Sequence, residues 1–423
     1  MKHRIKFISL LCLWSLTTFA QNSKETAFFE GSKLFSTVER YVSLGEHRTG
    51  TDTDFATSEW LGKELSTQGY EVKYHTFGLK QFFLDKAFVT DPTDSTVYEA
   101  FPLWYVQDSI RLQAEGILTS NVSNPDTILD KIVLVNFTLG LNGRGATQVY
   151  QQLQDLISKG ARAIIGFTEN EANEIIALNA SKAGSPWKIP ILLVSPKHAK
   201  QLLKKEGKII KVAIHGEFAQ VNARNVYGKI GNNESFIVVS TPISGWFTCG
   251  GERGPGVAVW LALAQWASTQ KLPYTFIFTA NSGHELGFWG ADEFLEHHAP
   301  PTDKTKLWIH LGAGLATLSW KSTPSGLIKE NKVDPQRNFF YTTSTKTAFE
   351  RVFKNILGNK WDTQQKNGGE LIHVVNKGYP NAIGVSYAHP FFHTKNDDAS
   401  KTSPEILEEI ALAFKNLILE IAK

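Results

Sequence analysis

Cysteine is nearly absent from this chain. Of its 423 residues, two are cysteines, Cys12 and Cys249. Cys12 falls in an N-terminal leader that we expect to be removed, and the one thiol left cannot form an internal disulfide. A small scaffold held together by disulfides is thereby excluded, so the fold depends on its own buried core. Cys249 has no recognisable partner base, and we interpret it as a small apolar side chain rather than a nucleophile.

An excess of one charge and a long hydrophobic run are also missing. The formal net charge is +3, and lysine and arginine form no basic stripe, which argues against a nucleic-acid partner. After residue 20, no segment is long and apolar enough to span a membrane. The sequence indicates nothing about the oligomeric state.

The N-terminus has the pattern of a secretory signal peptide. Lys2, Arg4 and Lys6 precede an apolar run over residues 7–16, and small residues lead to Ala20. This order of a basic, an apolar and a small-residue region predicts a signal peptide at residues 1–20, cleaved near Ala20. The apolar run is about half the length that crosses a bilayer. We therefore expect an exported protein, periplasmic or extracellular.

Hydrophobic periodicity predicts an α/β fold. Helices are expected over residues 24–46, 54–68, 147–159, 256–268 and 290–297. Strands are expected over residues 72–77, 132–136, 163–168, 190–194, 236–240, 274–279 and 307–311. Strands that alternate with helices favour a mainly parallel sheet sandwiched by helices. In such sheets the functional site lies at the C-terminal ends of the strands.

Several metal-ligand residue types follow predicted strands. Glu252 comes after the strand at residues 236–240, Glu285 after that at 274–279, and His310 closes the strand at 307–311. Carboxylates and imidazoles that converge from several strand ends are what a metal-dependent hydrolase needs. Position 288 is Phe, so His284 and Glu285 do not open a His-Glu-x-x-His helix. Any site is therefore assembled from distant segments.

Ordered motifs along the chain carry a family resemblance. Residues 48–50 read Arg-Thr-Gly, residues 285–290 read Glu-Leu-Gly-Phe-Trp-Gly, and residues 393–397 read His-Thr-Lys-Asn-Asp. In these motifs the chain resembles the zinc aminopeptidase family, which also contains glutaminyl cyclases and the transferrin receptor. The resemblance implies a metallopeptidase-like α/β domain over residues 21–84 and 217–423. It also implies a smaller β/α protease-associated-like insert over residues 85–216.

The chain departs from this family at the metal site. Complete members have two metals, five protein ligands and a glutamate base. The first histidine ligand falls at Pro242, the bridging aspartate at Glu252, and the ligand aspartate near Gly312. The glutamate pair of base and ligand becomes His284-Glu285. Two ligands and the glutamate base are thus replaced.

The resemblance leaves three positions for one metal. Glu252, Glu285 and His393 correspond to the residues that hold a single zinc in the glutaminyl cyclases. Three protein ligands with an open fourth position are typical of a catalytic zinc. His284 would then be the general base, because imidazole titrates near neutral pH. Alternatively, His310 completes the coordination and the metal is structural.

Each candidate also has an interpretation without a metal. Glu252 is adjacent to Arg253, and a salt-bridged loop carboxylate is the commoner and favoured case. His284 could instead hydrogen-bond a loop, and His310 could be a satisfied, half-buried histidine. His297 ends a predicted helix together with His298, where a cation is favoured and no function is required.

Three functional hypotheses follow. The first is an exported single-zinc hydrolase or cyclase that acts on peptides or amino-acid derivatives. The second is a catalytically inactive relative that serves as a binding or structural protein. The third, a conventional two-zinc aminopeptidase with substituted ligands, is disfavoured because losing a base or ligands costs orders of magnitude in rate.

Overall fold

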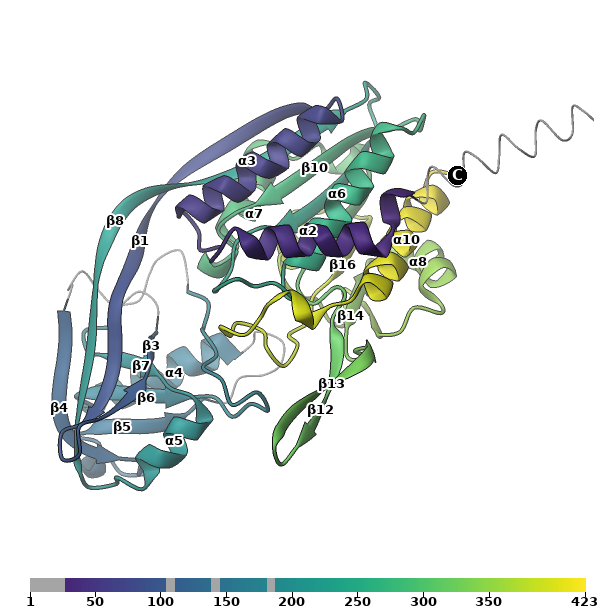
Figure 1. Ribbon diagram of the computed structural model, residues 1–423. Helices are drawn as coiled ribbons and strands as arrows, with labels where there is room; N and C mark the ends of the chain where they lie inside the picture. The colour runs from purple at the N-terminus through teal and green to yellow at the C-terminus, as the bar shows by residue number, and fades with distance from the viewer. Residues whose placement is uncertain (1–26, 104–110, 138–144, 181–186) are drawn as a thin grey trace, which may run out of the picture.

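A large α/β unit and a smaller one are joined by two long strands (Figure 1). The computed structural model describes residues 27–103, 111–137, 145–180 and 187–423. The predicted signal peptide at residues 1–20 lies outside these ranges. No helix in the described part of the chain is long and apolar enough to cross a bilayer.

The large unit is built on a mixed sheet with a parallel centre. Its strand order is β15-β14-β16-β11-β9-β10-β8. The strands are β8 (Ile209–Ile230), β9 (Phe236–Pro242), β10 (Thr275–Asn281), β11 (Thr305–Leu311), β14 (Asn338–Tyr341), β15 (Asn359–Asp362) and β16 (Ala382–Val385). The central strands β10, β9, β11 and β16 are parallel neighbours, while β8 and β14 join them antiparallel. The predicted helix-flanked α/β sheet is therefore confirmed.

Helices cover both faces of this sheet. One face carries α2 (Gly31–Ser43), α3 (Asp52–Thr67), α6 (Gly254–Ser268), α8 (Lys346–Phe353) and α10 (Pro404–Ile421). The other face carries α7 (Trp289–His297) and α9 (Leu371–Asn376). Along β9, Ile237 and Val239 enter the first core and Val238 enters the second. A strand buried on both faces needs a continuous apolar run, which is the pattern seen in the sequence.

The strands β1 (Glu71–Asp91) and β8 run side by side from one unit to the other (Figure 1). β1 extends well beyond the strand predicted at residues 72–77. A register shift between Leu84 and Lys86 interrupts its pairing with β8. Such a bulge moves the inside–outside alternation by one residue, so the period-two pattern breaks although the strand continues. The boundaries predicted after residues 84 and 216 both fall within these strands.

The smaller unit continues the same sheet from β8 through β4 and has a core of its own. It contains β2 (Thr96–Glu99), β3 (Phe101–Pro102), β4 (Arg111–Thr119), β5 (Ile132–Asn136), β6 (Ala163–Phe167), β7 (Ile191–Leu193), α4 (Gly145–Ser158) and α5 (Pro196–Leu203). Its core also includes Trp246, Phe247 and Leu286, which come from loops of the large unit. The smaller unit therefore packs directly against the loops that follow β9 and β10. A separate hairpin, β12 (Leu318–Thr323) with β13 (Gly326–Val333), projects from the large unit (Figure 1).

Candidate functional site

The loop before α6 is held by Asp397. The carboxylate oxygens of Asp397 accept hydrogen bonds from the backbone N–H groups of Gly251 and Glu252, at 2.8 and 3.0 Å. A Cβ on Gly251 would lie 2.7 Å from Asp397 Oδ1, so the approach requires glycine. Asp397, the last residue of the motif at 393–397, therefore holds the neighbouring loop in place.

Glu252 and Arg253 form an ion pair inside the protein. Nη2 of Arg253 lies 2.5 Å from Oε1 of Glu252, and neither side chain is exposed. Arg253 also donates from Nε to the carbonyl of Ser244 at 3.2 Å. Burial pushes the pKa of Glu252 upward, but Arg253 and His393 outweigh it and hold this pKa below its usual range. The salt bridge favoured from sequence is present, and its guanidinium places a positive charge inside the site.

Both carboxylate oxygens of Glu285 accept hydrogen bonds. The backbone N–H of Thr49 donates to Oε1 at 2.7 Å, and the Ser244 hydroxyl donates to Oε2 at 2.9 Å. Glu285 is fully buried in a short turn after β10. The Arg-Thr-Gly motif at residues 48–50 therefore contributes a backbone donor that satisfies this carboxylate.

His284 is paired with a second buried carboxyl group. Its Nδ1 lies 2.8 Å from Oε1 of Glu370. Burial raises the pKa of Glu370 to about 8 and, with Arg253 nearby, lowers the pKa of His284 well below its usual range. At neutral pH the pair is an uncharged imidazole whose Nδ1 accepts a hydrogen bond from the protonated carboxyl group of Glu370. Low basicity makes His284 a weak general base, which favours its alternative role of hydrogen bonding.

His310 is completely buried rather than half-buried. Its Nδ1 lies 3.1 Å from the Ser240 hydroxyl, which also accepts from Trp308 Nε1 at 2.9 Å. Burial, and then Arg253, lower the pKa of His310 to about 3, so the ring is neutral. Its Nε2 has no hydrogen-bond partner among the described residues.

A segment of the smaller unit lies across the candidate site. Nδ1 of His393 is 2.9 Å from the carbonyl of Ala177, whose N–H donates to the His393 carbonyl at 3.0 Å. The N–H of Ala180 donates to the carbonyl of Glu285 at 2.9 Å, and Trp246 Nε1 donates to the Asn179 side chain at 2.9 Å. We call residues 177–180 the cover segment. It is hydrogen-bonded to two of the three predicted metal ligands.

The predicted zinc ligands do not form one set. Nε2 of His393 lies 3.4 Å from Oε1 of Glu252, the same oxygen that Arg253 Nη2 approaches to 2.5 Å, so an ion shared by His393 and Glu252 would compete with Arg253. Both oxygens of Glu285 accept hydrogen bonds as well. A metal beside Glu252 would also meet the positive charge of Arg253. Among the described residues, one group of three such side chains has its ligand atoms within 4.8 Å, and it is His75, Glu293 and His297. The three predicted zinc ligands are therefore not gathered within that distance of one another, and a single zinc held by them stays a prediction.

Comparison with known proteins identifies the surrounding domain. The family model of peptidase family M28 matches residues 252–418. This segment is a peptidase family M28 domain. No curated protein matches the chain by sequence. The M28 match begins at Glu252 and contains Glu285, His310 and His393.

Solved structures share this fold over nearly the whole chain. BSAP, a zinc aminopeptidase from Bacillus subtilis, is 14% identical with a TM-score of 0.70, covering 93% of this chain and 95% of that one. A peptidase M28 precursor from Shewanella amazonensis is 15% identical with a TM-score of 0.72, covering 95% and 96%. The glutaminyl cyclase of Porphyromonas gingivalis is 10% identical with a TM-score of 0.50, covering 93% and 99%. At these identities, the likeness establishes the zinc-aminopeptidase type of fold.

Several residues of the M28 site were not assigned a role from sequence. Ser244, Glu370 and Asp397 each hold a candidate residue in place through a hydrogen bond. The motif at residues 393–397 was the one signal for Asp397. Nothing in the sequence marks the cover segment, because most of its bonds use backbone atoms.

A small cavity lies beside the site, between the two units. Its volume is about 200 Å³, and its lining combines both charges with apolar side chains. The lining residues are Glu99, Ala100, Phe101, Asn173, Glu174, Ile175, Ser195, Lys197, His198, Phe247 and Lys395. Phe247 and Lys395 come from the large unit and the others from the smaller one, so the cavity exists because the two units pack together.

Proposed function

We propose that this metallopeptidase-type protein is an exported, non-hydrolytic relative of the M28 peptidases that binds peptides or amino-acid derivatives. The observation that carries the proposal is the buried pair of Arg253 and Glu252, at 2.5 Å. A fixed guanidinium beside the carboxylate satisfies the charge that a metal would otherwise balance. Such a buried pair is stable only when both partners remain together.

The cover segment supports the same proposal. Ala177 is hydrogen-bonded to His393 and Ala180 to Glu285, and we infer that the segment blocks the approach of a substrate to these two residues. Hydrolysis would require this segment to leave and Arg253 to turn away. Both changes would leave buried polar groups without partners, at a cost of about 1–3 kcal/mol for each group.

The cavity between the units is the proposed ligand site. Glu174 and Lys197 offer opposite charges to the two ends of a small zwitterion, while Phe101, Ile175 and Phe247 offer apolar contact. Binding pockets commonly combine an apolar lining with a few polar groups that fix orientation. A short peptide or an amino-acid derivative has the matching chemistry.

A thermal-shift titration with Xaa-Ala-Ala tripeptides tests the binding function. We expect at least one of them to raise the Tm of the wild-type protein, and Lys197→Ala to abolish that rise. Lys200→Ala is the matched control, because Lys200 lies on the same helix but does not line the cavity. If no tripeptide raises the Tm, or if Lys197→Ala responds like wild type, the proposal is wrong.

A single-zinc hydrolase or cyclase is the second candidate. It is favoured by the 3.4 Å separation of Glu252 Oε1 and His393 Nε2, because both atoms are buried and His393 Nε2 has no hydrogen-bond partner among the described residues. Turnover of aminoacyl-p-nitroanilides or glutaminyl peptides with added ZnCl₂ tests it. We expect no turnover above background. Turnover that is present in the wild-type protein and lost in His393→Ala would support the single-zinc enzyme and contradict the non-hydrolytic proposal.

A further inference from the structure

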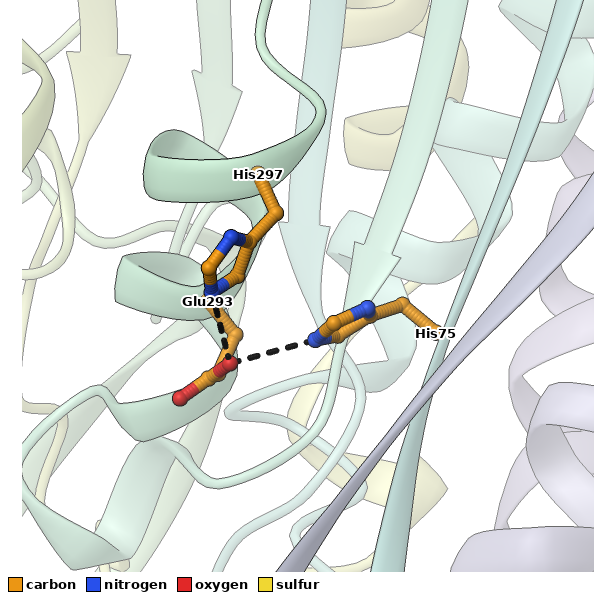
Figure 2. Close-up of side chains that lie close together, drawn as sticks. All are labelled: His75, Glu293 and His297. Atoms are coloured by element: carbon orange, nitrogen blue, oxygen red, sulfur yellow. Dashed lines mark hydrogen bonds and ion pairs between the residues drawn. The ribbon is translucent and has the colours of Figure 1, made fainter.

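Three potential metal ligands converge between β1 and α7 and share no residue with the candidate site described above. His75 lies on β1, and Glu293 and His297 lie one helical turn apart on α7 (Figure 2). Both imidazoles face the same carboxylate oxygen. Oε2 of Glu293 is 3.1 Å from His75 Nε2 and 3.5 Å from His297 Nε2.

These separations suit a tetrahedral ion. Ligand atoms at the usual zinc distances in a tetrahedral site lie about 3.3 Å from each other. The observed 3.1 and 3.5 Å lie on either side of that value, and all three ligand atoms are within 4.8 Å of one another. Histidine and glutamate are common zinc ligands, and an i, i+4 pair places two of them on one helical face.

A chain of hydrogen bonds holds His75 in orientation. Nδ1 of His75 lies 2.8 Å from Nε2 of His298, and Nδ1 of His298 lies 3.2 Å from the hydroxyl of Tyr227. When Nε2 of a neutral histidine binds a metal, its Nδ1 carries the proton and needs an acceptor. Nε2 of His298 supplies that acceptor, and the N–H at Nδ1 of His298 then donates to the hydroxyl of Tyr227, so the chain fixes one tautomer of each ring.

The other two ligands are also suitable. The second oxygen of Glu293 accepts from Trp289 Nε1 at 3.2 Å, which leaves Oε2 for the two histidines. The side chain of His297 is 52% exposed, whereas those of His75 and Glu293 are 20% and 25% exposed. The site is therefore half-buried on two sides and open to solvent on the third, where an ion and a water molecule can enter.

We propose that His75, Glu293 and His297 bind one divalent transition-metal ion, with zinc the best match, and leave a fourth position open. The ion would tie β1, which leads into the smaller unit, to the helix that follows Glu285. This proposal does not depend on the proposed function of the M28 site, because the two share no residue.

Equilibrium dialysis of the full-length protein against ZnCl₂, followed by elemental analysis, tests the proposal. We expect one equivalent of zinc on the wild-type protein and none on His297→Ala or His75→Ala. We expect His298→Ala to retain the ion but to weaken its binding by about 10–100-fold, because it removes only the supporting hydrogen bond. Cobalt substitution should give the intense visible absorption of a tetrahedral site.

Two controls separate this site from the others. Glu296→Gln changes a carboxylate on the same helix that pairs with Lys377 instead, and it should keep the zinc. Glu285→Gln changes the M28 site and should also keep it. The proposal is overturned if the wild-type protein takes up no zinc, if His297→Ala retains it, or if Glu285→Gln loses it.

Discussion

Arg253 Nη2 lies 2.5 Å from Glu252 Oε1 at the start of α6, and both side chains are fully buried. The M28 domain thus contains its own cation beside the residue that resembles the family's bridging ligand. Arg253 also lowers the pKa of His310 and His284 in addition to the effect of burial. One arginine therefore sets much of the electrostatics of the site.

Removing this arginine should destabilise the protein strongly. Arg253→Met leaves Glu252 buried without a partner, and we expect a loss of about 3–5 kcal/mol in the free energy of unfolding. Urea denaturation measures it. Adding Glu252→Gln should restore part of the loss, since no uncompensated charge then remains. Arg351→Met, at an exposed arginine that pairs with Glu420, is the control. If Arg253→Met lowers the free energy of unfolding by less than about 1 kcal/mol, the Arg253–Glu252 pair does not stabilise the loop before α6.

Glu285 should matter for stability whether or not zinc is added. Glu285→Ala removes two hydrogen bonds to an ionised group, which contribute about 1.5–3 kcal/mol each before any relaxation. We therefore expect a loss of several kcal/mol in urea unfolding, with Glu285→Gln losing less because an amide oxygen still accepts from Thr49. Chelator should leave the difference between wild type and variant unchanged. A difference that disappears with chelator would make Glu285 a metal ligand.

The cover segment should be as protected as the core. The N–H groups of Ala177 and Ala180 donate to the backbone carbonyls of His393 and Glu285. If this segment stays closed, native-state hydrogen exchange of both amides should be slow and similar to that of β10. Exchange at the rate of an open loop would mean that the segment lifts from His393 and Glu285 and leaves them open to a substrate.

A buried histidine near the site predicts a pH dependence. Burial lowers the pKa of His47 to about 4 from 6.5, although the Tyr41 carbonyl opposes this. The unfolded chain therefore binds a proton that the folded chain does not, so stability is full above pH 6.5 and falls as the pH drops toward 4. The expected loss over this range is about 3 kcal/mol from this group. In urea unfolding, His47→Gln should flatten that part of the pH profile; an unchanged slope would show that His47 is not responsible.

The regular elements of the fold were largely predictable from sequence. The strand expected at residues 132–136 is β5, and the helix expected at 256–268 is α6 with two further residues at its start. Both are apolar along nearly their whole length, and this pattern can be read without knowing which distant residues they contact. The length of β1 was not predicted: the expected strand ended at residue 77, and the bulge near Leu84 interrupts the alternation farther along.

The site was predictable in its residues but not in its contacts. Motifs marked Glu285 and His393, and the neighbouring positions of Glu252 and Arg253 made a salt bridge a stated alternative. Whether Glu252 forms a salt bridge or binds a metal depends on where its side chain points. A sequence does not contain that direction. The three histidine and glutamate side chains beside α7 show the same limit. His75 and Glu293 are separated by 218 positions, and only the fold brings them together.

The central claim is that the Arg253–Glu252 pair leaves the M28 site without zinc. Zinc content measured in His297→Ala tests it most directly, because that variant removes the proposed zinc site of His75, Glu293 and His297. Two variants would be dialysed against ZnCl₂, freed of unbound metal and analysed for zinc: His297→Ala, and the double variant that also carries His393→Ala. We predict less than about 0.1 equivalent of zinc in both proteins, since the guanidinium of Arg253 already balances the charge of Glu252. One equivalent in His297→Ala that disappears when His393→Ala is added would contradict the account.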